Sequence, residues 1–209
     1  LVPVSMVGEV PMVLVTNPNF EAKTLPQLIG YARANPGKLT FALNALGSQS
    51  HLLTELFQVR TGTSINMIPY KGSSPAVADL LGGVVSANFE NLPVVLEHIK
   101  SGRLRALAVL SPERLGYLPD VPTFTELGMK EFVASPWFAM VAPKGTPPEI
   151  VKTLNENINK ALSSDMVNDA FSKLGASPII QSPEATGRFI KDEIGKWSTI
   201  VKETGAKLQ

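Results

Sequence analysis

Short apolar segments with the length of β-strands alternate with helical patterns through most of this chain. Such alternation indicates an α/β fold, in which helices pack on the faces of a largely parallel sheet. The strand candidates are Met12 to Thr16, Leu39 to Leu43, Ile65 to Ile68, Ala87 to Phe89, Leu104 to Leu110 and Phe138 to Val141. The helical patterns between them are Leu25 to Ala34, Ser50 to Arg60, Pro75 to Leu81 and Pro93 to Lys100.

Three threonines are each followed three residues later by Gln or Glu, which is the capping-box pattern. We therefore expect helices to begin near Thr24, Thr123 and Thr146. The last third of the chain carries helical spacing throughout. It predicts a helix after Thr146, a short helix from about Asp165 to Leu174, and a long amphipathic helix after Ser182-Pro183 that places Trp197 in its apolar stripe.

Composition excludes several classes of protein. The 209 residues are 44% hydrophobic, which suffices for one large domain or two small ones. Basic and acidic residues number 19 and 18 and are scattered, so no nucleic-acid or anionic-membrane surface is expected. Cysteine is absent, which excludes thiol catalysis and disulfides. Leu1 is neither an initiator Met nor part of a basic leader region, so we expect a processed or trimmed front.

Polar strand-to-helix turns carry the functional signal. A helix N-terminus has unpaired N–H groups and a partial positive charge, which suit a carboxylate or phosphate. If the strands are parallel, the turns fall together at the carboxyl edge of the sheet, where open α/β sheets bind ligands. The sequence therefore predicts a small-anion receptor. Its candidate ligand-binding residues are Asn44, Ala45, Gly47, Ser48, Gln49, Ser50 and His51 in the first turn, Tyr70, Lys71, Gly72 and Ser73 in the second, and Asn91 in the third.

Each of these turns also has a purely structural interpretation. Ser48 and Ser74 are favoured helix caps by residue type alone. Lys71 can be a solvated turn lysine, and Asn91 can form an Asx turn ahead of its helix. The functional interpretation rests on the repetition of the same chemistry at neighbouring strand ends.

Enzymatic chemistry has little support in the sequence. Ser48, Ser50 and His51 cluster, but adjacent residues on one helical turn do not face each other, and no G-x-S-x-G motif occurs. His51 and His98 lie too far apart for a local metal motif. Neither of the two Gly-rich motifs that bind nucleotide phosphates, G-x-x-x-x-G-K-[ST] and G-x-G-x-x-G, is present. We expect no catalytic residue, no metal and no cofactor.

Ordered blocks along essentially the whole chain resemble the substrate-binding proteins of tripartite tricarboxylate transporters, the Bug or TctC-type receptors. The number of blocks and their order make the resemblance specific. They are Ala32 to Leu39, Gly47 to Leu52, Pro69 to Ser73, Asn91 to Pro93, Gly102 to Val109, Leu118 to Thr123, Trp137 with Phe138, and Ala142 to Pro147.

The resemblance implies a fold like that of class II periplasmic binding proteins, in which two α/β lobes close on a small organic acid. It implies a periplasmic receptor that is not an enzyme, has no nucleic-acid partner, and delivers a carboxylate to membrane transporter subunits. It also implies that Trp137 contacts the ligand, together with the turns around Gly47 to His51 and Tyr70 to Ser73 and residues near Asn91.

Residues 17–137 are expected to form one continuous lobe, and residues 1–16 with 138–209 a discontinuous and incomplete one. Two departures from the family matter. Leu43 to Leu46 is bulkier than the family's small, glycine-rich stretch, and the first part of the family's N-terminal lobe has no counterpart ahead of Leu1. Homo-oligomers through the incomplete lobe are therefore expected. The alternative function is the ligand-sensing effector domain of a transcription regulator, although the sequence shows no basic winged-helix segment.

Overall fold

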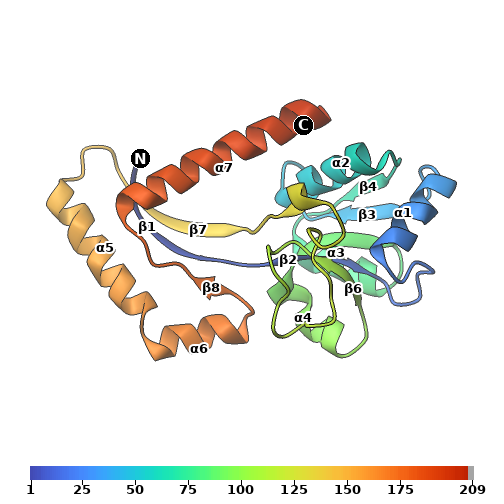
Figure 1. Cartoon of the computed structure of the whole chain (residues 1–209), viewed down its shortest axis with the longest axis horizontal. Helices are drawn as coiled ribbons and strands as arrows, with labels where there is room; N and C mark the ends of the chain where they lie inside the picture. The colour runs from blue at the N-terminus through green and yellow to red at the C-terminus, as the bar shows by residue number, and fades with distance from the viewer. Residues whose placement is uncertain (207–209) are drawn as a thin grey trace. The chain divides into compact units, whose positions relative to one another are not determined.

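The computed structural model describes residues 1–206, which divide into two compact units (Figure 1). Unit 1 contains Leu1–Val10 and Ser135–Thr199, and unit 2 contains Pro11–Ala134 and, of the described residues, also 200–206. The first boundary differs from the expected one at residue 16, because Met12–Thr16 pairs on both sides with strands of unit 2. Trp137, which was expected in the other lobe, belongs to unit 1.

A five-stranded sheet forms the centre of unit 2, in the order β4-β3-β5-β2-β6. Strand β3 pairs in parallel with both β4 and β5, whereas β2 is antiparallel to both β5 and β6. The sheet is therefore mixed, with one reversed strand between parallel ones. Its strands are β2 (Met12–Thr16), β3 (Thr40–Leu43), β4 (Asn66–Pro69), β5 (Ala87–Asn91) and β6 (Arg105–Val109).

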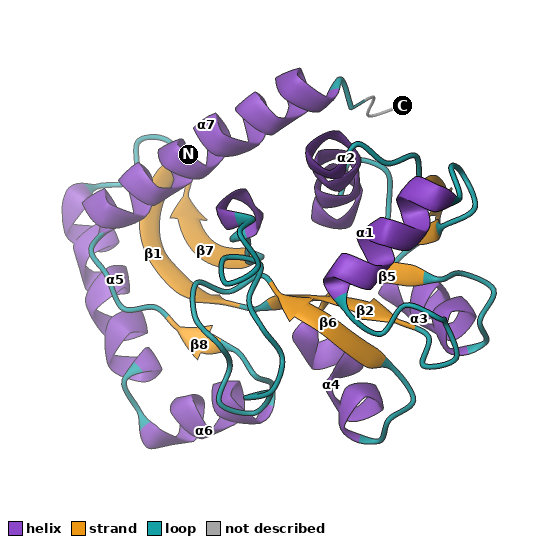
Figure 2. Ribbon diagram, turned by 45° about the vertical axis from the view of Figure 1, so that its right-hand side comes forward, coloured by secondary structure: helices purple, strands orange, loops and turns teal. Residues whose placement is uncertain are grey.

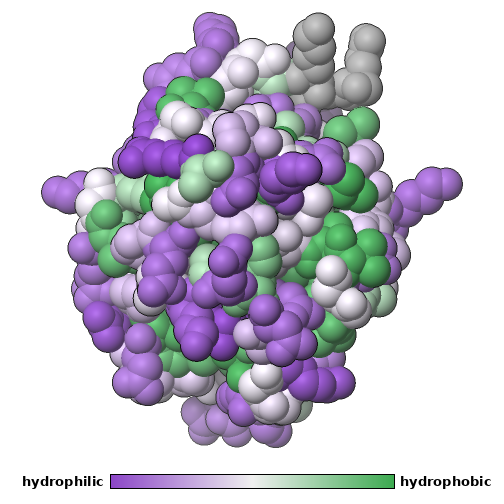
Figure 3. Space-filling model, turned by 90° about the vertical axis from the view of Figure 1, so that its right-hand side faces the viewer, coloured by the Kyte–Doolittle hydropathy of each residue, from purple (hydrophilic) through white to green (hydrophobic). Residues whose placement is uncertain are grey.

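Helices cover both faces of this sheet, with α1 and α2 on one face and α3 and α4 on the other (Figure 2). Their bounds agree with the sequence prediction to within two residues, because each follows a polar or Gly-containing turn that marks where the helix begins. They are α1 (Leu25–Ala34), α2 (Gln49–Thr61), α3 (Ser73–Leu81) and α4 (Leu92–Lys100). Figure 3 shows one side of unit 2, where hydrophobic residues lie in separate groups among hydrophilic ones.

Alternation along the strands divides the core of unit 2 into two layers. On the α2 face, the rings of Phe41, Phe57, Phe89, Phe124 and Phe132 pack with neighbouring centroids 4.8 to 6.3 Å apart. The α3 and α4 face is aliphatic. The last phenylalanine belongs to the 3₁₀ helix η1 (Lys130–Phe132), so the aromatic layer also fixes the long loop that precedes it.

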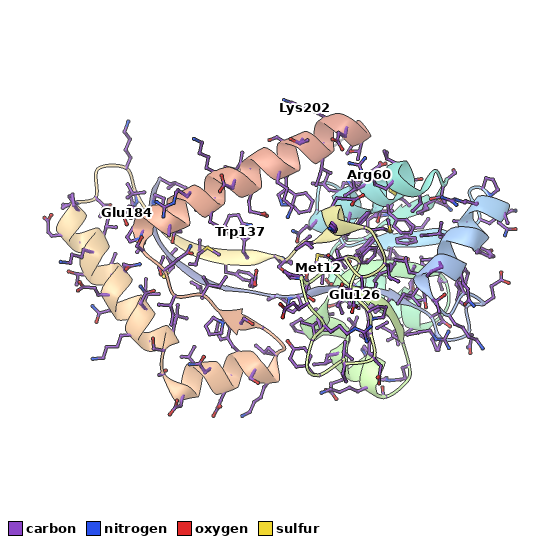
Figure 4. All side chains as sticks on the ribbon, in the orientation of Figure 1. Met12, Arg60, Glu126, Trp137, Glu184 and Lys202 are labelled. Carbon is purple, nitrogen blue, oxygen red and sulfur yellow. The ribbon has the colours of Figure 1, made fainter. Side chains whose placement is uncertain are left out.

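Unit 1 is built on a three-stranded antiparallel sheet in the order β7-β1-β8. Trp137, which Figure 4 labels, lies at the start of β7. Its ring packs edge-to-face on that of Phe189, with ring centroids 5.5 Å apart. Among the described residues, no helix has the length and apolarity needed to cross a membrane. The elements of unit 1 are β1 (Val2–Glu9), β7 (Trp137–Ala142), β8 (Ser177–Pro178), α5 (Pro148–Leu162) and α6 (Asp165–Lys173). Helix α7 (Pro183–Thr204) belongs to unit 1 up to Thr199 and to unit 2 from Ile200.

Two helix starts differ from the capping-box prediction. Thr123 and Glu126 exchange both capping hydrogen bonds, but a turn follows instead of a helix, and Gly128 ends it with φ of +84°. Thr146 makes no cap, since its hydroxyl donates to the carbonyl of Pro143 and α5 begins two residues later. The box between Thr24 and Gln27 does cap α1 as predicted.

Candidate anion-binding site

Three strand-to-helix turns of unit 2 meet at one edge of the five-stranded sheet. Strands β3, β4 and β5 run parallel, with Leu43 opposite Pro69 at their carboxyl ends. The backbone N–H of Gly72 donates to the carbonyl of Asn44 at 2.7 Å, which joins the second turn to the first. The predicted convergence of the turns at the carboxyl edge is therefore present in the structure.

Side-chain hydroxyls shape the first turn from within. Ser50 is 1% exposed, and its Oγ accepts the N–H of Asn44 at 2.9 Å. Ser48 caps α2 and donates its own proton to the carbonyl of Ala45 at 2.6 Å, so its contact with Ser50 at 2.9 Å leaves Ser50 as the donor there. Both hydroxyls are committed to the turn, and the unpaired N–H groups of the first turn of α2 remain for a ligand.

His51 supports the same turn from the helix side. It is 4% exposed, and its Nδ1 accepts the N–H of Gly47 at 3.0 Å. Because Nδ1 is an acceptor, the proton of the neutral ring lies on Nε2, which is 3.6 Å from Oε1 of Glu55. The φ of +74° at Gly47 is in the left-handed region, which favours glycine there. His51 thus orients the turn, and its Nδ1 is not available to a serine as a base.

The second turn directs its aromatic side chain toward helix α3. The hydroxyl of Tyr70 donates to Oδ2 of Asp79 on α3 at 2.7 Å. Burial, followed by this hydrogen bond, raises the pKa of Tyr70 to about 12. Lys71 is exposed, and Gly72 precedes α3 without any side-chain cap. The N–H groups at the start of α3 are therefore free of a capping side chain.

The third turn is the short step from β5 into α4. Asn91 is the N-cap residue of α4 but makes no side-chain cap hydrogen bond, and it is half-buried. The N–H of Leu92 donates to the carbonyl of Pro11 at 2.8 Å, and Pro93 has no N–H. Asn91 therefore offers an uncommitted amide side chain at the edge where the turns meet.

Glu90 was not among the predicted site residues, yet it connects all three turns. Its carboxylate is 0% exposed and accepts hydrogen bonds from Asn44 Nδ2, Ser73 Oγ, Asn88 Nδ2 and the N–H of Asn91 at 2.7 to 3.3 Å. Burial raises the pKa of this carboxyl, and the four hydrogen bonds oppose the rise. The available sequence signal was the alternation in Ala87–Asn91, which puts Asn88 and Glu90 together on the face opposite Phe89.

The charge pattern at this edge suits a small anion. The N-termini of α2, α3 and α4 all begin there, and each carries partial positive charge. A second candidate location is a pocket of about 730 Å³ in unit 1, but its wall contains Lys152 beside two acids, Glu156 and Glu184. Lys152 lies 3.9 Å from Glu156, so that wall has no spare cation. The predicted ligand contact of Trp137, which lies in unit 1, stays a prediction.

The chain has the fold of the periplasmic binding proteins. An R. palustris protein solved with adipate superposes with a TM-score of 0.89 at 37% identity, over 98% of this chain and 68% of that one. The periplasmic binding protein BugD superposes with a TM-score of 0.88 at 32% identity, over 99% of this chain and 70% of that one. The predicted α/β fold is thereby confirmed.

The sequence comparisons specify the family within that class. A family model described as tripartite tricarboxylate transporter family receptor matches residues 1–206. BugT of Bordetella pertussis is 63% identical over 209 residues, which are the whole of this chain and 64% of BugT. The chain therefore belongs to the tripartite tricarboxylate transporter receptor family, as its sequence blocks predicted, and it spans about two thirds of the length of this relative.

Proposed function

We propose that this chain is the ligand-binding portion of a periplasmic receptor that captures a small dicarboxylate and delivers it, unchanged, to the membrane subunits of a tripartite tricarboxylate-type transporter. The observation that carries the proposal is the convergence of three helix N-termini and their polar turns at one sheet edge. Family membership supports the transporter partner and the periplasmic location.

Backbone and amide donors, rather than a cluster of cations, would hold the acid. Lys71 is the only Lys or Arg between Asn66 and Glu90 and lies in an exposed turn. Helix N-termini stabilise an anion by partial charges and N–H groups that point at it. A ligand with two carboxylates fits this arrangement, and adipate, which the R. palustris neighbour was solved with, is such a ligand.

The match to a family of transporter receptors also weighs against the alternative function, which is an effector domain of a transcription regulator. Capture without conversion is supported by the side chains at the edge. The two serines and the histidine of the first turn are committed to internal hydrogen bonds, so none is arranged as a nucleophile with its base.

Calorimetric titration of the protein with adipate and with malate tests the proposal. We expect binding of at least one diacid and no binding of the matching uncharged diamide. Because the donors are mostly uncharged, affinity should fall by less than about tenfold between low and high salt. Lys152→Ala, in the pocket of unit 1, is the matched control and should leave affinity unchanged.

Four results would contradict this function. They are no binding of either diacid, equal binding of the diamide, loss of binding in Lys152→Ala, and a fall in affinity of several decades with salt. The last would mean that a cationic cluster holds the acid.

A further inference from the structure

Glu90 is a buried acid at a site that is proposed to bind an anion, and simple electrostatics would place a carboxylate elsewhere. It lies at the end of β5, is fully buried, and has no cationic partner among the described residues. An unpaired buried charge is costly unless it is fully hydrogen-bonded. Interactions of Glu90 must therefore offset the free energy of burying its carboxylate.

The hydrogen bonds of Glu90 supply these interactions. Oε1 accepts from Asn44 Nδ2 at 3.0 Å, from Ser73 Oγ at 3.0 Å and from the N–H of Asn91 at 2.7 Å. Each of these donors comes from a different strand-end turn. One oxygen atom thus holds together three donors, which lie 46, 17 and one residue away from Glu90 along the chain.

Every polar contact that reaches this carboxyl group is a donor. Oε2 accepts from Asn88 Nδ2 at 3.3 Å, and the same amide also donates to Oδ1 of Asn44 at 3.1 Å. A carboxylate accepts at both oxygens, whereas a glutamine side chain accepts at only one. Replacing Glu90 by glutamine would put one NH₂ group against another NH₂ or N–H donor.

We propose that Glu90 is the positioning residue of the dicarboxylate site: it ties the three turns into one rigid edge and so aims the N-termini of α2, α3 and α4 at the ligand. This inference rests on the proposed function. Glu90 itself is inaccessible, so its effect on the ligand passes through Asn44, Ser73 and Asn91. Positioning of donors before binding removes the ordering cost that a mobile site would have to overcome.

The Glu90→Gln variant tests the proposal, because the sign of its effect separates two explanations. If Glu90 acted only through its negative charge, removing the charge would strengthen diacid binding. If Glu90 positions the turns, binding should weaken by at least about tenfold, the scale of one hydrogen bond to a charged group. Glu97→Gln removes the same charge from the exposed face of α4 and should change affinity by less than about twofold.

A ligand-free measurement keeps this test independent of the proposed function. In amide NMR spectra of the protein without ligand, Glu90→Gln should broaden or shift the signals of the three turns and leave those of unit 1 unchanged. Ser73→Ala, which removes one donor from the surface side, should show the same effect in the second turn even if Glu90→Gln folds poorly.

The possible outcomes separate clearly. If the wild type binds neither adipate nor malate, the proposed function is wrong, while the ligand-free spectra still decide the role of Glu90. Unchanged or tighter diacid binding in Glu90→Gln, or spectra of both variants that match the wild type at the three turns, would overturn the positioning role.

Discussion

At the scale of single residues, Glu90 should give the stability of the protein a recognisable pH dependence. Its pKa in the folded chain is raised above the usual 4.5. Above pH 4.5 the unfolded chain has lost this proton while the folded chain retains part of it, so the free energy of unfolding should fall as pH rises through that interval. The contribution should be absent from Glu90→Gln.

Urea unfolding of the two proteins at a series of pH values measures this contribution as a difference. Glu126 and Glu184, whose pKa values are lowered, act in the opposite direction but are present in both proteins and cancel. A difference that stays constant with pH, or that grows in favour of the wild type as pH rises from 4.5, would contradict the pKa direction.

Tyr70 allows a second residue-scale prediction. Tyr70→Phe removes the hydrogen bond to Asp79 and should lower the free energy of unfolding by about 1 kcal/mol, which is less than is usual for a bond to a charged group because the pair is only half-buried. Urea unfolding at neutral pH checks the first value, and an unchanged midpoint would contradict it.

The location of the three turns was predictable from the sequence, whereas the hydrogen bonds of their side chains were not. Hydroxyl and amide residues after parallel strands gave the location of the three turns. Nothing in the spacing showed that Ser50 and Tyr70 bond inward, or that Glu90 would join the turns, because these bonds depend on strand order and on side-chain direction. A pattern along one segment carries no information about which distant segment lies beside it.

At the scale of elements, two glycines make a matched pair. Gly72 precedes α3 with φ of +111°, a conformation that is strained for any other residue, and an added Cβ would meet nothing within 4 Å. Gly30 lies exposed in α1, and its added Cβ would also meet nothing. Gly72→Ala should destabilise by about 1 to 3 kcal/mol, and Gly30→Ala should stabilise by about 0.5 to 1 kcal/mol.

Urea unfolding of both variants measures these changes, and affinity for adipate provides a second measurement. Gly72→Ala should also weaken diacid binding, since Gly72 joins the second turn to the first through Asn44. Gly30→Ala should leave affinity unchanged. If the free energy of unfolding changed with the same sign in both variants, the backbone conformation of the two glycines would not explain the changes.

Most elements were predictable because their local signals agree with their environment. All six predicted strands and the four helices of unit 2 occur. Strand β1 was missed, because Pro3 and Gly8 argue against a strand; the structure accommodates them with irregularities between Pro3 and Ser5 and between Met6 and Gly8. The helix expected after Thr123 does not form, because Gly128 soon ends the turn.

At the scale of the whole molecule, the edge of the unit 1 sheet supports the expected self-association. Strand β7 pairs on one side only and exposes 56% of Phe138 and 50% of Met140. An apolar strand with an open edge favours pairing with another chain. We therefore predict a dimer or larger assembly through unit 1, which Met140→Lys should weaken.

Light scattering over a range of concentrations measures the assembly. The wild type should gain mass with concentration, and Met140→Lys should stay closer to the monomer mass while still binding adipate through unit 2. A wild type that remains monomeric at high concentration would contradict the prediction.

The most direct test of the account is a titration of the isotopically labelled protein with adipate, followed by amide NMR. The account predicts that the largest shift changes fall on the first-turn N–H groups of α2, α3 and α4 and on Asn44, Gly72 and Asn91. Changes that fall instead on the unit 1 pocket around Val151 and Asn155, or no change at saturating adipate, would contradict it.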